Sequence, residues 1–481
     1  MTTTISPTGR LSAVHATARP VAMLASVVGE QRHARLMSAA RDFRARFAGH
    51  TIWTVSSTAS GGGVAEMLHA LVGYVRDLDL DIRWLVISGD PEFYTVTKHL
   101  HHLLHGFPGR LTLGPDSVAH YEDVLAANAQ DLLGRVHPGD IVLLHDPQTA
   151  GLAPWLTHAG VHVVWRSHIG TDLQNAATWE GWDFLRPYLQ HADAYVFSRR
   201  AFVPAWLPAE RTRIITPSID PFAPKNQELA PATVRALLAG AGLIDAPVTG
   251  PPVYARPDGS TGLIARRATV VAESLPGPDE PLVVQVSRWD PLKDMAGVMR
   301  AFAEHVVPYV PGRLVLAGPA LVSDDPEGAL IRAACVQQWR ELPRPVRERI
   351  VLASLPVDDV TENAVLVNAL QRHAAVVTQK SLAEGFGLTV AEAMWKGRPV
   401  VASAVGGIPD QITDGTGVLV PDPSDLAAFG TALCGLLSDP VTREALGMAA
   451  HERVRAAFVG DLHLLRYAEL LTALRSAVPG G

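Results

Sequence analysis

Two glutamates eight residues apart, Glu384 and Glu392, flank a glycine-containing turn. The apolar run 374–378 before the turn is typical of a strand, and 388–396 after it favours a helix. The first backbone amides of such a helix lack intrahelical partners and attract phosphate, while the carboxylates can accept hydrogen bonds from sugar hydroxyls. The pattern predicts a site for a nucleotide sugar; a turn that only joins strand to helix is the alternative. The residues expected to bind this sugar donor are Gly385, Phe386, Gly387, Leu388, Thr389 and Glu392.

Two basic residues follow another predicted strand, which spans 282–286. Arg288 and Lys293 come shortly after it, and Pro291 restricts the turn between them. Because both cations would lie at the carboxyl end of the strand, they could bind one diphosphate and stabilise it as a leaving group, as a metal ion does elsewhere. We predict that Arg288, Lys293 and Glu384 are catalytic. The alternative is a pair of solvated surface cations.

Polar residues and glycines also follow predicted strands in the N-terminal half. Gly62 and Gly63 come after strand 52–56, where glycines allow close backbone approach to a phosphate or a sugar hydroxyl, and we expect them to bind the donor. His168 comes after strand 162–165 and could bind a sugar hydroxyl or transfer a proton, so we predict it to be catalytic. A plain tight turn and a structural histidine are the alternatives. The residues expected to bind a hydroxyl-rich acceptor are His145, Asp146, Gln148 and Arg166.

Short apolar segments alternate with helical patterns along most of the chain, which predicts parallel sheets covered by helices on both faces. Three prolines between 217 and 224 interrupt the alternation, and a segment rich in proline and glycine at 246–281 predicts a loop or small hairpin. The predicted fold class is therefore α/β, with two doubly wound, Rossmann-like domains that face each other across a ligand-binding cleft. The predicted limits are a mobile N-terminal arm at 1–28, a first domain at 29–217, a linker at 218–226, a second domain at 227–459 and a C-terminal helix at 460–481.

Composition restricts the partners and the compartment. A net charge of −7 over 481 residues does not favour a nucleic-acid partner, because nucleic-acid-binding surfaces are basic. Cys335 and Cys434 are the only cysteines and lie far apart, which fits a reducing cytoplasm rather than a disulfide framework. No run reaches the roughly 20 apolar residues of a membrane-spanning helix. The histidines between 99 and 105 lack a carboxylate or cysteine to complete a metal site, so we expect no metal centre. From the charge, the cysteines and the absence of a long apolar run we expect a cytoplasmic location and small-molecule partners. A homodimer is left open.

Three patterns together resemble the retaining glycosyltransferases of the GT-B fold, glycosyltransferase family 4. They are the glycines at 61–63, the Arg-x4-Lys pair of Arg288 and Lys293, and the E-x7-E pair of Glu384 and Glu392. Five further segments resemble a narrower group, the trehalose glycosyltransferring synthases and retaining trehalose phosphorylases. These segments are 60–66, 92–98, 145–148, 165–168 and 217–220. One departure is Gly170, which stands where the resemblance leads us to expect an acid.

The resemblance implies roles for these residues. The second domain would bind the nucleotide, with Glu392 at the ribose hydroxyls and Glu384 at the donor sugar. Arg288 and Lys293 would hold the diphosphate, and His168 would contact the sugar near the reacting carbon. The first domain would bind the acceptor, and the C-terminal helix would cross back onto that domain.

The activity that the resemblance implies is the transfer of glucose, with retention, from ADP-glucose or UDP-glucose to free glucose, giving trehalose. The nucleotide sugar would be a cosubstrate, no cofactor would be tightly bound, and the motifs would accommodate Mg²⁺ without requiring it. Three alternatives stay open. They are a trehalose phosphorylase, a transferase for a pseudo-sugar or secondary-metabolite acceptor, which Gly170 allows, and a nucleotide-sugar sensor without turnover.

Overall fold

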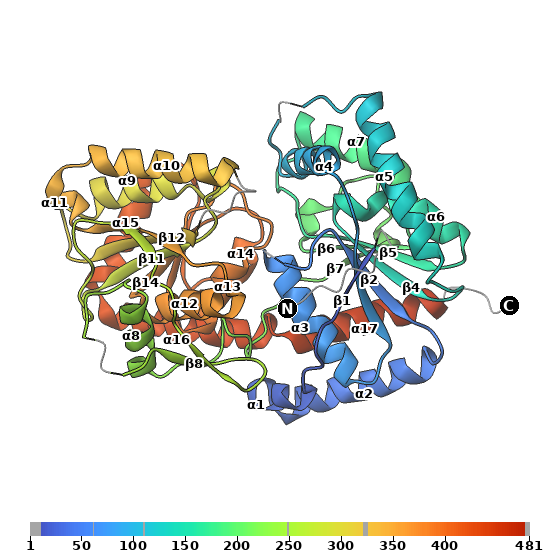
Figure 1. Ribbon diagram of the computed structural model, residues 1–481, viewed down its shortest axis with the longest axis horizontal. Helices are drawn as coiled ribbons and strands as arrows, with labels where there is room; N and C mark the ends of the chain where they lie inside the picture. The colour runs from blue at the N-terminus through green and yellow to red at the C-terminus, as the bar shows by residue number, and fades with distance from the viewer. Residues whose placement is uncertain (1–10, 61, 109–110, 248–249, 321–325, 477–481) are drawn as a thin grey trace. The chain divides into compact units, whose positions relative to one another are not determined.

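The computed structural model describes residues 11–60, 62–108, 111–247, 250–320 and 326–476 (Figure 1). The chain divides into two compact units, one formed by Met1–Ser218 together with Phe458–Gly481 and the other by Ile219–Ala457. These divisions lie close to the predicted domain limits at 217 and 459. Each unit has its own sheet with helices on both faces, and the two are described separately.

The first unit contains a seven-stranded sheet in the order β1-β3-β2-β4-β5-β6-β7. Six of its strands are parallel, as predicted: β2 (Ile52–Ser56), β3 (Ile82–Val86), β4 (Ile141–His145), β5 (His162–Ser167), β6 (Ala194–Phe197) and β7 (Thr212–Ile214). The edge strand β1 (Ser12–Val14) pairs antiparallel with β3. Helices of this unit are α1 (Ala25–Val28), α2 (Glu30–Arg46), α3 (Gly63–Asp77), α4 (Pro91–Leu104), α5 (Pro115–Leu133), α6 (Ala153–His158), α7 (Ala176–Leu189) and α17 (Gly460–Ser476), with 3-10 turns η1 (Val21–Leu24), η2 (Pro147–Leu152), η3 (Arg200–Phe202) and η4 (Ala209–Arg211).

Alternate residues of the central strands are buried on opposite faces of this sheet. Val142 and Leu144 of β4 pack with helices α4 to α7, whereas Ile141 and Leu143 of the same strand pack in the core that α2 and α17 complete. In that second core Leu470 and Leu471 of α17 lie with Phe43 of α2 and with Phe47, which follows that helix. The last helix is therefore part of the first unit's core.

The expected mobile arm at 1–28 is wrong for the part of it that the structure describes. Residues 12–14 form β1 because the outer edge of β3 offers unpaired backbone groups. Flanking residues are tied down as well, since the Leu11 amide donates to the Asp131 carboxylate at 2.9 Å and the Val21 amide donates to Asp77 at 2.8 Å. Residues 1–10 lie outside the described residues.

The second unit repeats the architecture, with a seven-stranded sheet in the order β10-β13-β12-β11-β14-β15-β16. Its parallel strands are β11 (Leu282–Val286), β12 (Arg313–Pro319), β13 (Ile350–Leu355), β14 (Val376–Gln379), β15 (Val400–Ser403) and β16 (Val418–Val420), with β10 (Thr269–Val271) antiparallel at the edge. The helices are α8 (Pro231–Gly240), α9 (Met295–His305), α10 (Pro326–Glu341), α11 (Arg344–Arg347), α12 (Val360–His373), α13 (Leu388–Trp395), α14 (Ile408–Gln411), α15 (Leu426–Ser438) and α16 (Pro440–Ala457), with the 3-10 turn η5 (Pro291–Lys293). The predicted hairpin in 246–281 is present as β8 (Val253–Ala255) and β9 (Thr261–Leu263).

The strand order of each sheet determines where a ligand can bind. In parallel sheets of this kind, ligands bind at the carboxyl ends of the two strands between which the order of connection reverses. Those strands are β2 and β4 in the first unit, and β11 and β14 in the second. The segments that follow these four strands carry most of the predicted site residues.

No helix in the described part of the chain is long and apolar enough to cross a membrane. Cys335 and Cys434 are both free thiols.

Candidate active site

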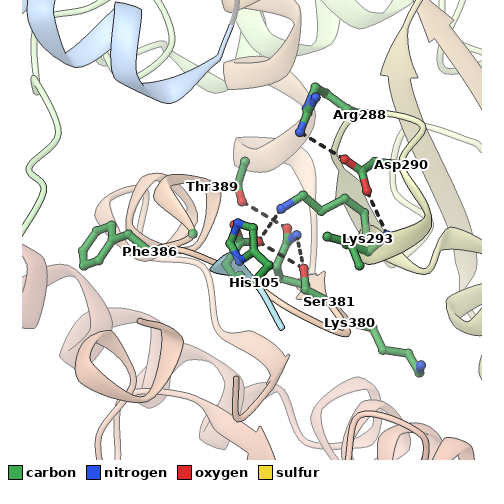
Figure 2. A network of polar contacts seen from close by, with 12 residues as sticks. His105, Arg288, Asp290, Lys293, Lys380, Ser381, Phe386 and Thr389 are labelled. Carbon is green, nitrogen blue, oxygen red and sulfur yellow. Dashed lines mark hydrogen bonds and ion pairs between the residues drawn. The ribbon is translucent and has the colours of Figure 1, made fainter. Parts of the chain in front are cut away.

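The centre of the site in the second unit is an ion pair between Lys293 and Glu384 (Figure 2). The Lys293 ammonium lies 2.6 Å from Glu384 Oε2, and the two side chains are only 16% and 11% exposed. Lys293 ends η5, after β11, and Glu384 lies in the turn after β14. The structure thus brings together two of the predicted catalytic residues, from the two strands that flank the point of reversal.

Backbone and side-chain hydrogen bonds hold these two turns against each other. The Leu382 amide donates to the Leu292 carbonyl at 2.8 Å. Gln285, buried inside β11, donates from its amide to the Lys293 carbonyl at 2.8 Å and accepts from the Lys380 amide at 3.1 Å. Ser381 adds a hydrogen bond from its hydroxyl to Glu384 Oε2 at 3.1 Å. The geometry of the ion pair is therefore fixed by the surrounding fold.

The glycine turn before α13 has a left-handed backbone at the residue that begins the helix. Gly387 is the N-cap of α13 and has φ +84°, a conformation that favours glycine. Phe386 is buried, and its carbonyl accepts a hydrogen bond from Gln411. The Thr389 hydroxyl, at the second position of the helix, donates to Gln379 at 3.0 Å. The N-terminus of α13, formed by Leu388 and Thr389, follows the Glu384 turn directly and provides amides for a phosphate group.

Two further glycines, which the sequence patterns did not single out, support this turn. The Gly407 amide donates to the Gly385 carbonyl at 2.9 Å. Gly406 lies so close to the chain that a Cβ atom there would overlap the carbonyl oxygen of Glu384, and its φ is +55°. Only a residue without a side chain fits at position 406.

We expect Gly406→Ala to lower the free energy of unfolding by about 2–3 kcal/mol, since it adds a clash to a left-handed backbone. Gly415→Ala is the matched control, because Gly415 has φ +77° with no atom within 4 Å of the added Cβ. The control should lose only about 1 kcal/mol, the strain of the backbone alone. Urea unfolding of both variants checks this. Equal losses in the free energy of unfolding would show that the surrounding backbone moves away from the added Cβ atom at no energetic cost.

Arg288 lies in the same segment but has a different environment. Its side chain is 63% exposed, and its guanidinium contacts the Asp290 carboxylate at 3.0 Å, as Figure 2 shows. Asp290 also accepts from the Leu292 amide at 2.8 Å and so caps η5. Exposed ion pairs of this kind contribute little to stability, which leaves the guanidinium able to move toward an anion.

Glu392 is buried one turn inside α13, with 4% of its side chain exposed. Its Oε1 atom lies 3.9 Å from the Lys225 ammonium. The neighbouring Lys396 is buried too and donates to the Glu392 carbonyl and to Asn226 Oδ1, each at 3.0 Å. Burial lowers the pKa of Lys396 to about 7, although the Glu392 charge acts in the opposite direction. Lys225 thus lies near the Glu392 carboxylate, whereas Lys396 contacts the backbone carbonyl of the same residue.

In the first unit, three buried side chains from β2, the end of β4 and the segment after β5 are linked by hydrogen bonds. The Thr54 hydroxyl of β2 lies 2.8 Å from Nε2 of His145, the last residue of β4. Nδ1 of His145 lies 2.9 Å from Nε2 of His168, which follows β5, and the two rings are stacked with centroids 5.2 Å apart. Burial, with the nearby Arg166 guanidinium, lowers the pKa of His145 to about 3 and the pKa of His168 well below its usual value.

Asp146 fixes the backbone of His168. Its Oδ1 atom accepts from the His168 amide at 2.7 Å, and its own amide donates to the Arg166 carbonyl at 2.8 Å. Burial raises the pKa of Asp146 to about 7. Its φ is +63°, which is unusual for a residue other than glycine, and such strained residues are common at functional sites.

Arg166 does not have the position that a direct acceptor contact needs. Its side chain is fully buried and donates to the Ser198 hydroxyl at 3.3 Å and to the Tyr467 hydroxyl at 3.5 Å. We predicted acceptor binding because Arg166 follows the strand pattern 162–165. The structure extends β5 through Ser167, so Arg166 is inside the sheet and points into the core beneath α17. The guanidinium therefore acts on the site only through its charge and its neighbours.

Other predicted residues have less defined surroundings. Gln148 lies in η2, and its buried Oε1 atom has no hydrogen-bond partner among the described residues. Gly62 has φ +82° and is the N-cap of α3, which begins at Gly63. Gly61 lies outside the described residues.

Gly170 is explained by its packing. A Cβ atom at this position would overlap the ring of Phe202, which is fully buried. The Gly170 carbonyl accepts from Nδ1 of His105 at 3.1 Å. The nearest acid along the chain, Asp172, forms a 2.6 Å ion pair with Arg199. An acidic side chain at position 170 is therefore excluded by Phe202 in this chain.

Acid should destabilise the first unit, because His145 stays neutral in the fold down to about pH 3. Below the usual histidine pKa of about 6.5 the unfolded chain gains a proton that the native state does not accept, so stability is lost as the pH falls. This group alone should cost about 2 kcal/mol between pH 7 and pH 5. Urea unfolding at both pH values should show a smaller loss for His145→Asn than for the wild type; equal losses would mean that His145 is protonated within the fold.

Several residues of this site were missed by the sequence patterns. Asn226, Lys225 and Lys396 surround Glu392, and His463 and Tyr467 of α17 lie beside Arg166. Lysine and asparagine outside any motif give no signal, and the contribution of α17 depends on contacts between residues about 300 positions apart. Within the described residues, no group of three or more His, Cys, Asp or Glu side chains is placed to hold a metal ion.

Comparisons with known proteins identify the family of the chain. The family model for the N-terminal domain of trehalose synthase matches residues 54–204, and the model for group 1 glycosyl transferases matches residues 280–439. A trehalose synthase from Pyrococcus horikoshii is 34% identical over 457 residues, which are 93% of this chain and 95% of that protein. The chain belongs to the trehalose synthase family. A second member, from Thermococcus litoralis, is 36% identical over 432 residues, 87% of this chain and 89% of that protein.

Membership of the trehalose synthase family makes the chain a trehalose-related glycosyltransferase. Among solved structures, an α,α-trehalose-phosphate synthase (UDP-forming) from Burkholderia xenovorans, in complex with glucose-6-phosphate, is similar over 88% of this chain and 100% of its own, with a TM-score of 0.65 and 16% identity. This likeness concerns the fold alone. It confirms the GT-B fold that the resemblance implied.

Proposed function

We propose that this chain is a retaining glucosyltransferase that transfers glucose from ADP-glucose or UDP-glucose to free glucose and so forms trehalose. The observation that carries the proposal is the 2.6 Å contact between Lys293 and Glu384, at the carboxyl ends of β11 and β14 and beside the N-terminus of α13. A cation, a carboxylate and free helix amides at one place suit the diphosphate and the sugar of a nucleotide sugar. The relatives named trehalose synthase support the identity of the product.

The ion pair prepares the site for its donor. Without a ligand, Glu384 neutralises Lys293 and keeps both side chains in a fixed position. A bound diphosphate would compete for the Lys293 ammonium and release Glu384 to accept a hydrogen bond from a sugar hydroxyl. Arg288, which is exposed and pairs with Asp290, would supply the second cation. Glu392, with the Lys225 ammonium nearby, would accept hydrogen bonds from the ribose hydroxyls.

The chemical step needs no protein nucleophile. The bond between the anomeric carbon and the diphosphate oxygen breaks, and its electron pair remains on that oxygen, where Lys293 and Arg288 stabilise the charge. The acceptor hydroxyl forms the new bond on the same face of the sugar, and its proton passes to the departing phosphate oxygen. The protein contributes position and charge. In this scheme the segments after β4 and β5 bind the sugars, with His168 as the residue that contacts them.

Incubation of the purified chain with ¹³C-labelled glucose and either ADP-glucose or UDP-glucose tests the proposal. We expect a disaccharide with one labelled ring, free nucleoside diphosphate in equal amount and the α,α-linkage by NMR. Parallel reactions with EDTA and with added Mg²⁺ test the metal requirement. A reaction of trehalose with inorganic phosphate that gives glucose 1-phosphate would identify a phosphorylase instead. Binding of nucleotide sugar without any disaccharide, over a panel of acceptors, would contradict the transferase assignment.

A further inference from the structure

The hydrogen-bonded chain Thr54, His145 and His168 determines where each proton lies. A threonine hydroxyl always carries a proton and needs an acceptor when it is buried. Thr54 is 1% exposed, and among the described residues its hydroxyl has one hydrogen-bond partner, Nε2 of His145 at 2.8 Å. The hydroxyl is therefore the donor in this contact, and Nε2 of His145 accepts and carries no proton.

The position of this proton determines the next one. A neutral imidazole without a proton on Nε2 carries it on Nδ1. His145 is neutral, because burial and the Arg166 charge lower its pKa to about 3. Nδ1 of His145 thus donates to Nε2 of His168 across 2.9 Å, and Nε2 of His168 is the acceptor. His168 is also neutral, so its single proton lies on Nδ1.

The remaining ring nitrogen of His168, Nδ1, is the last atom in this series of hydrogen bonds. Nδ1 of His168 makes no hydrogen bond to any residue that the structure describes, and the residue as a whole is 9% exposed. The backbone of His168 is fixed from the other side by the Asp146 carboxylate at 2.7 Å. Within the described part of the chain, this polar atom at the carboxyl end of β5 is thus left without a hydrogen-bond partner.

We propose that His145 is a positioning residue: together with Thr54 it fixes His168 in the Nδ1–H tautomer, so that His168 donates a hydrogen bond to a sugar oxygen. This assignment replaces the direct acceptor contact expected for His145, whose two ring nitrogens are both occupied within the fold. In this tautomer His168 is a donor and does not take a proton from a hydroxyl through Nδ1. That the oxygen belongs to a sugar rests on the proposed function, whereas the tautomer does not.

Nitrogen NMR of the full chain with ¹⁵N-labelled histidine rings tests the tautomer without any substrate. The His168→Gln spectrum identifies the signals of His168 by difference. We expect the wild type to show a protonated Nδ1 and an unprotonated Nε2 for His168. Thr54→Val removes the hydroxyl and keeps the shape, so it should shift His168 toward a mixture of tautomers, whereas Thr54→Ser should retain the wild-type spectrum. A protonated Nε2 in the wild type would overturn the proposal.

Kinetics separate positioning from a purely structural effect. We expect Thr54→Val and His145→Phe to lower kcat roughly tenfold with little change in the KM for the donor, because a misplaced proton weakens one hydrogen bond of the reacting complex. His145→Asn, whose amide can donate from the place of Nδ1, should recover most of the activity that His145→Phe loses. Equal losses in the Asn and Phe variants, with both folded by circular dichroism, would contradict the tautomer role. If no variant or wild type turns over any sugar, the proposed function fails, and the NMR result still decides the tautomer.

Discussion

Lys293→Ala should lower kcat by about 10²–10³, the usual effect of removing one group that stabilises charge in a transition state. The ammonium is held 2.6 Å from Glu384 and is mostly buried, so water would replace it poorly. The loss should appear in turnover more than in the KM for the nucleotide sugar, since charge on the diphosphate oxygen grows as the bond breaks. Steady-state kinetics with the donor varied at saturating acceptor measures both.

The matched control is Arg344→Ala. Arg344 also pairs with a glutamate of the same unit, Glu348 at 3.0 Å, but its side chain is 75% exposed. This variant should keep wild-type kinetics. Unchanged turnover in Lys293→Ala would show that the ammonium does not contact the leaving group, and an equal loss in the two variants would point to a general effect of charge.

Glu392→Gln should weaken donor binding by roughly 10- to 100-fold, because hydrogen bonds from ribose hydroxyls to a carboxylate are stronger than those to an amide. The buried carboxylate also lies 3.9 Å from the partly exposed Lys225 ammonium and favours the charged form of the buried Lys396, so its loss leaves both amines less well compensated. Calorimetric titration with the nucleoside diphosphate measures the affinity directly.

Glu341→Gln is the control for this change, because Glu341 lies on the exposed side of α10, where it accepts from Gln337. It should bind the nucleotide as the wild type does. If Glu392→Gln retains full affinity, the ribose assignment is wrong. If its affinity falls only for nucleotide sugars and not for free nucleoside diphosphate, Glu392 contacts the sugar instead.

The sequence predicted the second unit's site more fully than the first unit's. Lys293, Glu384 and the turn before α13 follow parallel strands, and the carboxyl ends of parallel strands share an edge, so strand prediction alone placed them together. Arg288 lies in the same segment, but its pairing with Asp290 depends on a rotamer that no pattern encodes.

In the first unit the sequence pattern predicted approximately where the strands end, but it did not predict which way each side chain points. The structure continues β5 two residues past the predicted end, through Ser167, so Arg166 lies inside the strand and not in the segment after it. Arg166 was therefore assigned to the acceptor although it is buried. The hydrogen bonds that link Thr54, His145 and His168 were not predicted, because they join residues distant in the sequence through side chains alone. The strand β1 was missed because three residues at an edge give too short a pattern.

The contribution of α17 to the first unit affects how this protein can be made. Domains commonly fold while the ribosome is still extending the chain. Here the core that contains Phe43 and Phe47 lacks Leu470 and Leu471, and Arg166 lacks Tyr467, until almost the whole polypeptide has been translated. The apolar surface that α17 covers in the first unit therefore stays exposed while the second unit is synthesised. A premature stop before α17 leaves the core of the first unit incomplete.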